Sequence, residues 1–299
     1  MLFADDTKIY SEVSQIGEQM GLQTQITKMH TWSTKWQLHF HPDKCKVLRI
    51  GTQDEIEYPY SLNRNILEHV QEEKDLGVHI DTKLKFEGHI SIKVNTANKI
   101  MGIIRWSFSY LDADMFKKLF TAMVRPHLEY AQQVWQPHLK KHITMIENVQ
   151  RMATKQIAGF SELSYYERLR SLDMPNLLYR RLRGDMIEVY KMLSGTYTNT
   201  SLPLDMSVNT RTRGHSKKLA QQHVNLDVRK YFFRNRVIKL WNHLPEVVVN
   251  APSIKSFEKR LDRFWDKYSI KFNLDNCLEF ISNPARTGAG SESIHKIWT

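Results

Sequence analysis

The chain has 299 residues, of which 41% are hydrophobic and 11% aromatic, a composition that argues against an intrinsically disordered protein. Its two cysteines, Cys45 and Cys277, exclude a disulfide framework and a CxxC zinc pair, and no apolar run of about 18 residues is present to span a membrane. The formal net charge of +11 favours a polyanionic partner such as nucleic acid. We therefore expect an intracellular protein, in the nucleus or the cytoplasm, with no membrane and no disulfide-linked partner.

The first predicted elements are a hairpin and a long helix. Leu2-Phe3 and residues 8–13 favour strands, and Ala4-Asp5-Asp6 between them predicts a tight β-turn with negative charge at its tip. From Gly21, apolar residues recur at steps of three and four and predict an amphipathic helix that ends before Pro42. The residues of this stripe are Leu22, Ile26, Met29, Trp32, Trp36 and Phe40. We expect the stripe to face the core rather than to stack nucleic-acid bases.

Short strands come next, and helices follow them. Strand patterns cover residues 44–50, two segments joined near 63–65, and residues 75–80. Beyond Phe86, helical periodicity predicts helices at 88–108, 112–132, 140–159 and 175–193, and, after a linker at 194–212, at 228–241 and 253–268. The Gly-Ser-rich end is expected to be disordered.

Positive charge is concentrated near the C-terminus. Residues 208–272 hold 15 Lys and Arg and 5 Asp and Glu, a net charge of +10, so the remainder of the chain is nearly neutral. We expect this segment to contact phosphates, aided by the interleaved aromatics Tyr231, Phe232, Phe233 and Trp241. The basic residues expected to bind nucleic acid are Arg211, Arg213, Lys217, Lys218, Arg229, Lys230, Arg234 and Arg236. The alternative is a solvated helix surface.

Two groups of side chains are candidate metal ligands. Carboxylates on a rigid hairpin supply the oxygen ligands that Mg²⁺ requires, so Asp5 and Asp6 could hold metal, although aspartate is also common in solvated turns. His127, His138 and His142 include an i, i+4 pair that could ligate zinc, but no HExxH glutamate accompanies them. We therefore favour exposed histidines over a zinc site.

The order of these features resembles the second half of the palm of reverse transcriptases encoded by non-LTR (LINE-like, jockey-like) retrotransposons. Phe3-Ala4-Asp5-Asp6 matches the family's metal-binding hairpin, and the stretches 32–36 and 43–47 match the helix and strand that follow it. Leu76-Gly77 lies in a segment that resembles the primer-grip strand, which steadies the primer end. Further motifs, including Arg125-Pro126-His127 and Arg234 to Pro245, extend the resemblance over nearly all of residues 1–270.

The resemblance implies a set of site residues. Asp5 and Asp6 would be catalytic carboxylates that bind Mg²⁺, and Lys44 would lie near the incoming nucleotide and could protonate pyrophosphate. The implied reaction is attack of a primer 3′-hydroxyl on a deoxynucleotide, templated by RNA and assisted by two metal ions. The implied partners are RNA and DNA as template and primer, together with deoxynucleotides.

The resemblance also indicates what these 299 residues lack. The family's fingers and an earlier palm strand with a further metal-binding aspartate would precede Met1, so we expect a truncated polymerase that is inactive by itself. The expected fold is α+β: a palm remnant at 1–86, a helical thumb-like region at 87–205, a basic helical region at 206–272 and a disordered tail at 273–299. The alternative function is a nucleic-acid-binding protein without chemistry, which retains only the thumb and the basic segment.

Overall fold

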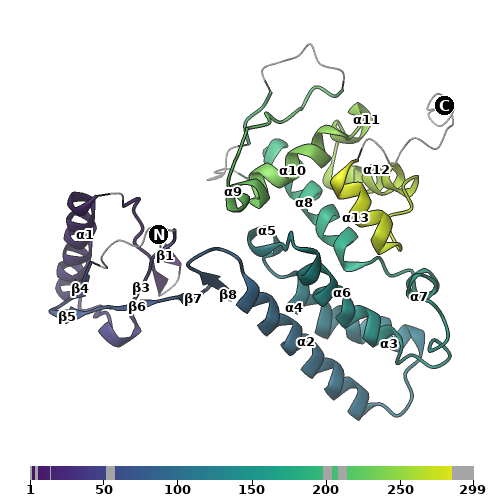
Figure 1. Ribbon diagram of the computed structural model, residues 1–299, viewed down its shortest axis with the longest axis horizontal. Coiled ribbons are helices and arrows are strands. Elements are labelled where there is room, and N and C mark those ends of the chain that lie inside the picture. The colour runs from purple at the N-terminus through teal and green to yellow at the C-terminus, as the bar shows by residue number, and fades with distance from the viewer. Residues whose placement is uncertain are drawn as a thin grey trace. The chain divides into compact units, whose positions relative to one another are not determined.

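The protein combines many helices with small sheets, in agreement with the predicted α+β class. A computed structural model describes residues 2–3, 6–13, 15–51, 58–197, 204–207 and 214–284. The chain divides into unit 1, residues 1–88, and unit 2, residues 89–299. Figure 1 shows the elements of unit 1 in purple and blue and those of unit 2 from blue through teal to yellow. Each unit is described by itself.

The described residues of unit 1 form four two-stranded sheets. In the first, β1 (Leu2–Phe3) and β2 (Asp6–Thr7) run antiparallel, with Leu2 opposite Thr7 and Phe3 opposite Asp6. The prediction that residues 8–13 form the second arm is wrong, because the arm is Asp6–Thr7 and residues 8–13 lie outside the strand. Asp6, expected in the turn, is a strand residue. The other strands are β3 (Lys46–Leu48) parallel to β6 (Glu68–Val70), the hairpin β4 (Ser61–Leu62) with β5 (Asn65–Ile66), and the hairpin β7 (Glu72–Asp75) with β8 (Val78–Asp81).

In each of the two later hairpins, a tight turn with left-handed backbone conformation joins the two strands. Asn63 and Arg64 have φ values of 50° and 66°, and Leu76 and Gly77 have φ values of 45° and 83°. Two consecutive positive φ values are the signature of the two-residue turn that suits the twist of paired strands. The β4–β5 hairpin agrees with the predicted connection near residues 63–65. The prediction of one strand over 75–80 is wrong, because Leu76-Gly77 reverses the chain between β7 and β8.

Helix α1 (Ile16–Lys35) ends earlier than its apolar stripe predicts. The N–H of Leu38 donates to the carbonyl of Ser33 and the N–H of Gln37 to that of Thr34, with Gln37 at a φ of 58°. These bonds form a Schellman motif, which satisfies the last carbonyls and turns the chain away. Pro42 therefore begins the 3₁₀ turn η1 (Pro42–Lys44) instead of ending the helix. The same turn shortens the predicted strand 44–50 to β3.

The two ends of the predicted stripe, but not its tryptophans, reach the small core of unit 1, where Phe40, beyond the end of α1, also packs. Leu22 and Ile26 pack against the buried cluster of Tyr60, Leu62 and Leu67. The prediction that both tryptophans lie in the core is wrong, since Trp32 is 46% exposed and Trp36 is 60% exposed. The α1 helix extends past the few strands that could cover it.

Unit 2 is helical throughout its described residues. Its elements are α2 (Glu87–Ser107), α3 (Ala113–Leu119), the π-helical segment η2 (Phe120–Val124), α4 (Arg125–Glu129), α5 (Gln132–Trp135), α6 (Lys140–Thr154), α7 (Tyr165–Leu172), α8 (Leu177–Leu193), α9 (Asp227–Tyr231), α10 (Phe233–Asn242), α11 (Glu246–Val249), α12 (Ile254–Asp266) and α13 (Leu274–Ser282). All six predicted helices coincide with elements of this series, whereas α5, α7, α11 and α13 are found only in the structure. No described helix is long and apolar enough to cross a membrane.

The π-helical segment η2 joins α3 to α4 without a break. Phe116, Phe120, Val124 and Leu128 are all buried, at exposures of 1% or less. The N–H of Arg125 donates to the carbonyl of Phe120, five residues earlier. Pro126 follows and has no N–H to offer to the helical ladder. The wider π-helical turn therefore keeps the apolar side chains before and after Pro126 on the same buried side of the helix.

The core of unit 2 surrounds α8, which lies in the middle of the unit in Figure 1. Helices α6, α10, α12 and α13 all pack against α8. Residues from 206–272, including Trp241 and Trp265, share this core with Met186 and Val189 of α8. The expectation of a disordered tail from residue 273 is wrong for α13, because its Cys277 and Phe280 are fully buried in the same core.

Candidate functional site

Asp6 is an exposed residue of β2, directly after the turn of the first hairpin. Its register partner is Phe3, so the matched motif Phe3 to Asp6 begins and ends on paired strands. Asp5, the other predicted catalytic carboxylate, lies outside the described residues. The exposed position leaves the Asp6 carboxylate open to solvent and to a hydrated cation.

One ion pair brings this hairpin to a second motif far along the sequence. The Lys8 ammonium pairs with the Asp75 carboxylate, and each side chain is 30% exposed. Lys8 follows Asp6 by two residues, and Asp75 immediately precedes the Leu76-Gly77 turn. The structure therefore brings together the two predicted sites, the carboxylate hairpin and the primer-grip-like turn, although 67 residues separate Lys8 from Asp75.

Lys44, the third predicted catalytic residue, is exposed at the end of η1. Within the described part of the chain, no hydrogen bond or ion pair joins Lys44 to Asp6. The neighbouring Cys45 is half-buried, and burial raises the pKa of its thiol. The structure thus places Lys44 at the end of η1, two residues before β3, and no described contact links its side chain to the hairpin.

Magnesium is the metal that the resemblance implies at the hairpin. Carboxylate oxygen is the donor that Mg²⁺ prefers, so the chemistry of Asp6 fits. Among the described residues, however, no three His, Cys, Asp or Glu side chains lie close enough together to hold a metal ion. The described donors therefore do not complete a magnesium centre, and no catalytic step through a metal follows from them.

Arg236, which is predicted to bind nucleic acid, forms an ion pair with a carboxylate inside unit 2. Its Nε and Nη2 atoms donate to the two carboxylate oxygens of Asp185 at 2.9 and 3.1 Å. The two side chains are 11% and 3% exposed. Burial raises the pKa of the Asp185 carboxyl, and the Arg236 charge opposes that rise. Nη1 donates to the Tyr231 carbonyl at 3.4 Å, so each nitrogen of the guanidinium has a partner within unit 2. Arg236 therefore joins α10 to α8, and its two-bond fork to Asp185 would have to open before it could grip a phosphate in the same way.

The other basic residues that are predicted to bind nucleic acid differ in their exposure and in their partners. Arg234 pairs with Asp205, and the Lys217 ammonium donates to the carbonyl of Val249 at 3.3 Å. Lys218 is half-buried. Arg229 and Lys230 are exposed on α9. Arg211 and Arg213 lie outside the described residues.

The aromatic residues of the basic segment divide between surface and core. The prediction that all four interleave with the surface charges is wrong for Phe233 and Trp241, which are 3% and 0% exposed. Phe232 is 43% exposed. Tyr231 stacks on His138, with ring centroids 4.0 Å apart, and the Lys230 ammonium lies 5.2 Å from the Tyr231 ring. Two of the four aromatics are therefore near the surface.

A buried polar cluster near α8 is absent from the predictions. Glu147 is fully buried; its carboxylate accepts hydrogen bonds from the Tyr165 hydroxyl and, at 3.0 Å, from the Leu177 N–H. Burial raises the Glu147 pKa and lowers that of Arg181, whose fully buried guanidinium has no hydrogen-bond partner among the described residues. The signal for this cluster is a charged residue within the apolar face of α6, beside Ile146 and Gln150. Its burial assigns it to the fold rather than to an open site.

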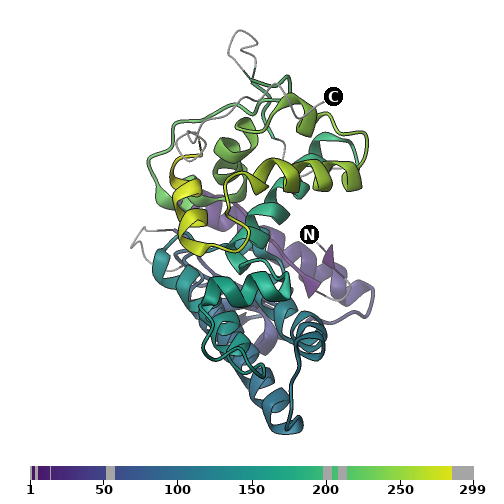
Figure 2. The same ribbon diagram turned by 90° about the vertical axis from the view of Figure 1, so that its right-hand side faces the viewer.

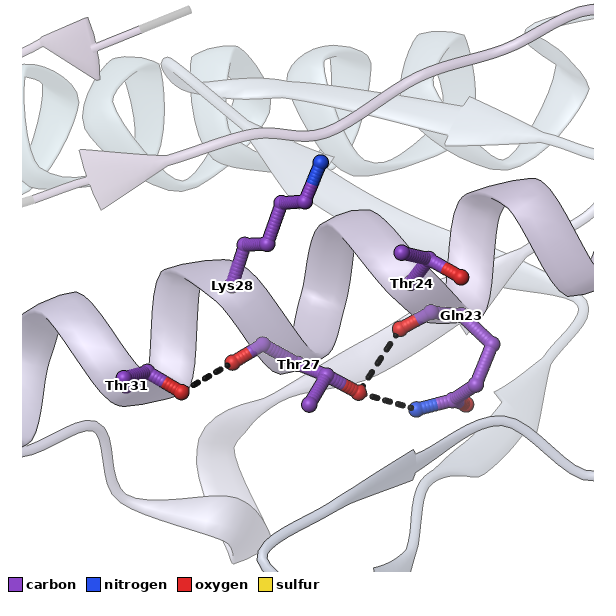
Figure 3. A pocket seen from close by; sticks show the side chains of 5 residues that line it. All are labelled: Gln23, Thr24, Thr27, Lys28 and Thr31. Atoms are coloured by element: carbon purple, nitrogen blue, oxygen red, sulfur yellow. Dashed lines mark hydrogen bonds between the residues drawn. The ribbon is translucent and has the colours of Figure 1, made fainter.

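A shallow hollow of about 350 Å³ lies on α1 and is shown in Figure 3. The Thr27 and Thr31 hydroxyls donate to the carbonyls four residues earlier, as the dashed lines show. The Gln23 side chain exchanges two hydrogen bonds of 2.9 Å with the backbone of Ser61 on β4. These polar groups are satisfied by the helix and its neighbouring strand, which favours a structural role for this face.

The sequence is similar to curated polymerases of mobile elements. It is 24% and 25% identical over 175 residues to the "RNA-directed DNA polymerase from mobile element jockey" of Drosophila melanogaster and of Drosophila funebris. It is 26% identical over 174 residues to the "Probable RNA-directed DNA polymerase from transposon BS" of Drosophila melanogaster. No family model and no solved structure matches the chain.

These similarities cover 56–57% of this chain and 19% of each of the three polymerases. They agree with the family to which the sequence motifs showed a resemblance. Over more than half of its length, the chain is therefore related to jockey-type RNA-directed DNA polymerases, and it contains a region of the reverse-transcriptase type found in non-LTR retrotransposons.

Proposed function

We propose that the chain is part of an RNA-directed DNA polymerase of a non-LTR retrotransposon. In this proposal residues 1–86 form the late part of the palm, residues 87–205 a thumb-like region and residues 206–272 a basic C-terminal region. The reaction is the templated addition of a deoxynucleotide to the 3′-hydroxyl of a primer. RNA is the template, and the primer and product are DNA.

The observation that carries the proposal is the ion pair between Lys8 and Asp75. In nucleotide addition, the attacking hydroxyl must be held beside the groups that activate it, because proximity and alignment provide much of the rate. The second strand of the carboxylate hairpin begins at Asp6 and ends at Thr7, next to Lys8, and the Leu76-Gly77 turn begins directly after Asp75. A primer end held at that turn would lie beside the aspartates, and this proximity supports the assignment of both motifs.

The proposed role of Asp5 and Asp6 is to bind Mg²⁺, which in phosphoryl transfer stabilises charge on the attacking and leaving oxygens. Lys44 is proposed to donate a proton to the leaving pyrophosphate. A complete clamp requires carboxylates beyond the one that the described residues supply. We therefore propose that the 299-residue polypeptide by itself does not extend a primer.

The decisive experiment exchanges the aligned segment of the jockey polymerase for the corresponding segment of this chain. We expect the chimaera to synthesise DNA on an RNA template with Mg²⁺, and Asp5→Ala to lower the rate by at least about 100-fold, because removing a group essential for transition-state stabilisation has effects of this order. A chimaera whose Asp5→Ala variant retains its rate would sink the metal assignment. Template-dependent extension by the isolated 299-residue chain would overturn the proposed inactivity.

A second candidate function is nucleic-acid binding without chemistry. The observation that favours it is the exposure of Arg229 and Lys230 on α9, in a unit whose fold does not involve the aspartate hairpin. Under this alternative, the chimaera would be inactive with either residue at position 5, whereas the isolated chain would still bind RNA and DNA. Binding and synthesis measured on the same preparations separate the two functions.

A further inference from the structure

Helix α12 (Ile254–Asp266) has a buried side and a basic side. Its apolar residues Phe257, Leu261 and Trp265 are at most 1% exposed and pack into the core of unit 2. Figure 2 shows this helix, in yellow-green, on the side of the unit that faces the viewer. The packed side fixes the helix, so the residues on its other side hold a defined arrangement.

A row of four basic residues follows the exposed side of α12 and its C-cap. Its members are Lys255, Lys259, Arg263 and Lys267, all of which are exposed. Residues four apart lie on one face of a helix and rise by about 6 Å. Within the described residues, Lys255, Lys259 and Arg263 have no hydrogen bond or ion pair, and the Lys267 ammonium lies 4.1 Å from the Phe264 ring. We call this set the α12 basic row.

Nearby carboxylates do not neutralise this row. Glu258 and Asp262 lie on the flank of α12 and pair with Arg183 of α8, at 3.4 and 2.7 Å. Arg260, the remaining arginine of α12, donates to the carbonyl of Val247. Asp266, the third carboxylate of α12, is exposed beside the C-terminal end of the row and forms no ion pair among the described residues. The row thus has four cations and one nearby carboxylate that is not paired elsewhere, and it keeps a net positive charge.

The arrangement is unfavourable for the helix itself. Like charges at positions i and i+4 repel, and the row contains three such pairs in succession. Lys255 also lies in the first turn, where the helix dipole disfavours a cation, whereas Arg263 lies in the last turn, where the dipole favours one. The unfavourable terms are therefore the repulsion along the row and the position of Lys255. The fold gains no hydrogen bond or ion pair from the first three side chains in return. An anionic ligand that follows the helix axis would relieve the repulsion.

We propose that the α12 basic row binds the sugar-phosphate backbone of RNA or DNA without reading its sequence. The row extends about 18 Å along the axis of α12, and each strand of a duplex carries one phosphate for about every 3.4 Å of its axis, so several phosphates lie within reach of the row. A membrane-binding helix would need exposed apolar residues beside its cations, whereas the apolar residues of α12 lie in the core. The nucleic-acid partner rests on the proposed function; the row lies within the basic segment 208–272 but shares no residue with the eight named from the sequence as binding nucleic acid.

The test compares two charge-matched variants of the full chain. Lys255→Gln, Lys259→Gln and Arg263→Gln together neutralise the row, whereas Lys99→Gln, Lys118→Gln and Lys155→Gln together remove the same charge from exposed positions on other elements. Binding is measured by fluorescence anisotropy with 20-mers of RNA and DNA of unrelated sequence, from about 50 to 200 mM KCl. Circular dichroism verifies that both variants remain folded.

We expect the row variant to bind all of the oligonucleotides at least about 30-fold more weakly at 100 mM salt and to lower the slope of log affinity against log salt by about two to three. The control should change affinity by less than about threefold, since it removes charge without removing phosphate contacts. A second measurement, acetylation of Lys255 and Lys259 in the unmodified chain, should be slowed by bound RNA.

Equal losses in the two variants, or unimpeded acetylation with RNA bound, would overturn the inference while leaving the proposed polymerase intact. Preferential binding to anionic lipid vesicles or to an acidic protein, with no binding to the oligonucleotides, would also overturn it. If the unmodified chain binds no nucleic acid at low salt, both the inference and the nucleic-acid partner of the isolated chain fail. Lys255→Arg and Lys259→Arg, which keep the charges, should preserve binding.

Discussion

Units 1 and 2 bury their largest side chains to very different extents. Unit 2 covers Trp135, Trp241 and Trp265 almost completely, at exposures of 2% or less, although it leaves Trp106 of α2 89% exposed. Unit 1 buries neither of its tryptophans, since Trp32 and Trp36 are 46% and 60% exposed. Burial of apolar area is the dominant favourable term in folding, so the two units differ in the main source of their stability. The polymerase-like hairpins belong to the unit with the smaller core.

The contrast shows that the motifs predicted to carry chemistry lie apart from the packing that stabilises most of this chain. In unit 1 the positions of Asp6 and of the Leu76-Gly77 turn depend on two-stranded sheets and a half-exposed ion pair. Two-stranded hairpins are marginally stable in water without further packing. Unit 2, by contrast, is held by a continuous apolar core around α8.

The largest expected difference is in local unfolding. Amide protons of β7 and β8 should exchange at least about 100-fold faster than those of α8, because the hairpin has little apolar cover and α8 lies in the core. Hydrogen exchange of the full chain, followed by mass spectrometry, measures this difference. Equal protection of the β7–β8 hairpin and of α8 would show that the two units do not differ in local stability.

A matched pair of tryptophan variants tests the same contrast by mutation. Trp241→Ala should lower the free energy of unfolding by about 3–5 kcal/mol, because it leaves a large cavity in the core. Trp36→Ala should change it by less than about 0.5 kcal/mol, because the ring is mostly exposed. Urea unfolding followed by circular dichroism gives both values. A larger loss for Trp36→Ala would mean that unit 1 buries this ring against something.

Removal of one partner from the buried ion pair of unit 2 should be nearly as costly. Arg236→Leu leaves the Asp185 carboxylate buried without its partner, and we expect a loss of about 3 kcal/mol. Asp185→Leu combined with Arg236→Leu should recover part of that loss, since no buried charge is left unpaired. Arg229→Leu is the exposed control and should be nearly neutral. If Arg236→Leu were as mild as the control, Arg236 would be available for a ligand.

Acid should weaken unit 2 through His215. Its Nε2 lies 3.0 Å from the Trp241 carbonyl and its Nδ1 accepts from the Lys217 N–H at 3.2 Å, so the neutral ring fits. Burial lowers the His215 pKa from its usual 6.5, and the unfolded chain therefore binds the proton more readily. The stability that neutral His215 contributes is present above about pH 6.5 and is lost as the pH falls through the lower, folded pKa.

Urea midpoints at several values between about pH 7.5 and 5.5, for the unmodified chain and for His215→Gln, measure this effect. Burial raises the pKa of Glu147 and of Asp185, so these carboxyls oppose the trend, and only the difference between the two proteins reports on His215. We expect His215→Gln to have the shallower loss on acidification. Parallel pH profiles would show that the imidazole is not responsible.

The smallest expected effect is at the ion pair between the two hairpins. Lys8→Gln should lower the free energy of unfolding by only about 0.2–1 kcal/mol, because both partners are partly solvated. It should nevertheless increase hydrogen exchange in β7, because Asp75 loses its partner. Asp43→Asn, at an exposed acidic position, serves as the control. Identical exchange in both variants would show that the pair does not position the hairpins.

Much of the helical part of the fold could be predicted, because apolar residues recur with the helical period wherever one side of a helix packs on the core. The turn at Leu76-Gly77 could not, since leucine rarely adopts a positive φ and only Gly77 marked the position. The end of α1 was missed for the same reason, with Gln37 in the left-handed region.

At the candidate sites, the sequence shows residue types but not their partners. Arg236 and Arg229 are equivalent in a count of charge, and only the structure shows Asp185, 51 residues away, against Arg236. Phe233 and Trp241 likewise lie among cations in the sequence and in the core in space. The four-residue spacing of the α12 basic row can be read from the sequence. The net charge of residues 208–272, however, does not distinguish this row from the other basic residues of the segment.

The π-helical segment η2 fixes the rotational phase of the chain on either side of Pro126. In an α-helix each residue turns by about 100°, so the three four-residue steps from Phe116 to Leu128 would rotate the last side chain by about 120° out of line with the first. The wider turn takes up this excess, and all four apolar side chains are buried. Deletion of a single residue from η2 would preserve every apolar side chain outside it, yet turn Leu128 and all that follows in α4 away from the core. The length of this stretch is thus as constrained as its composition.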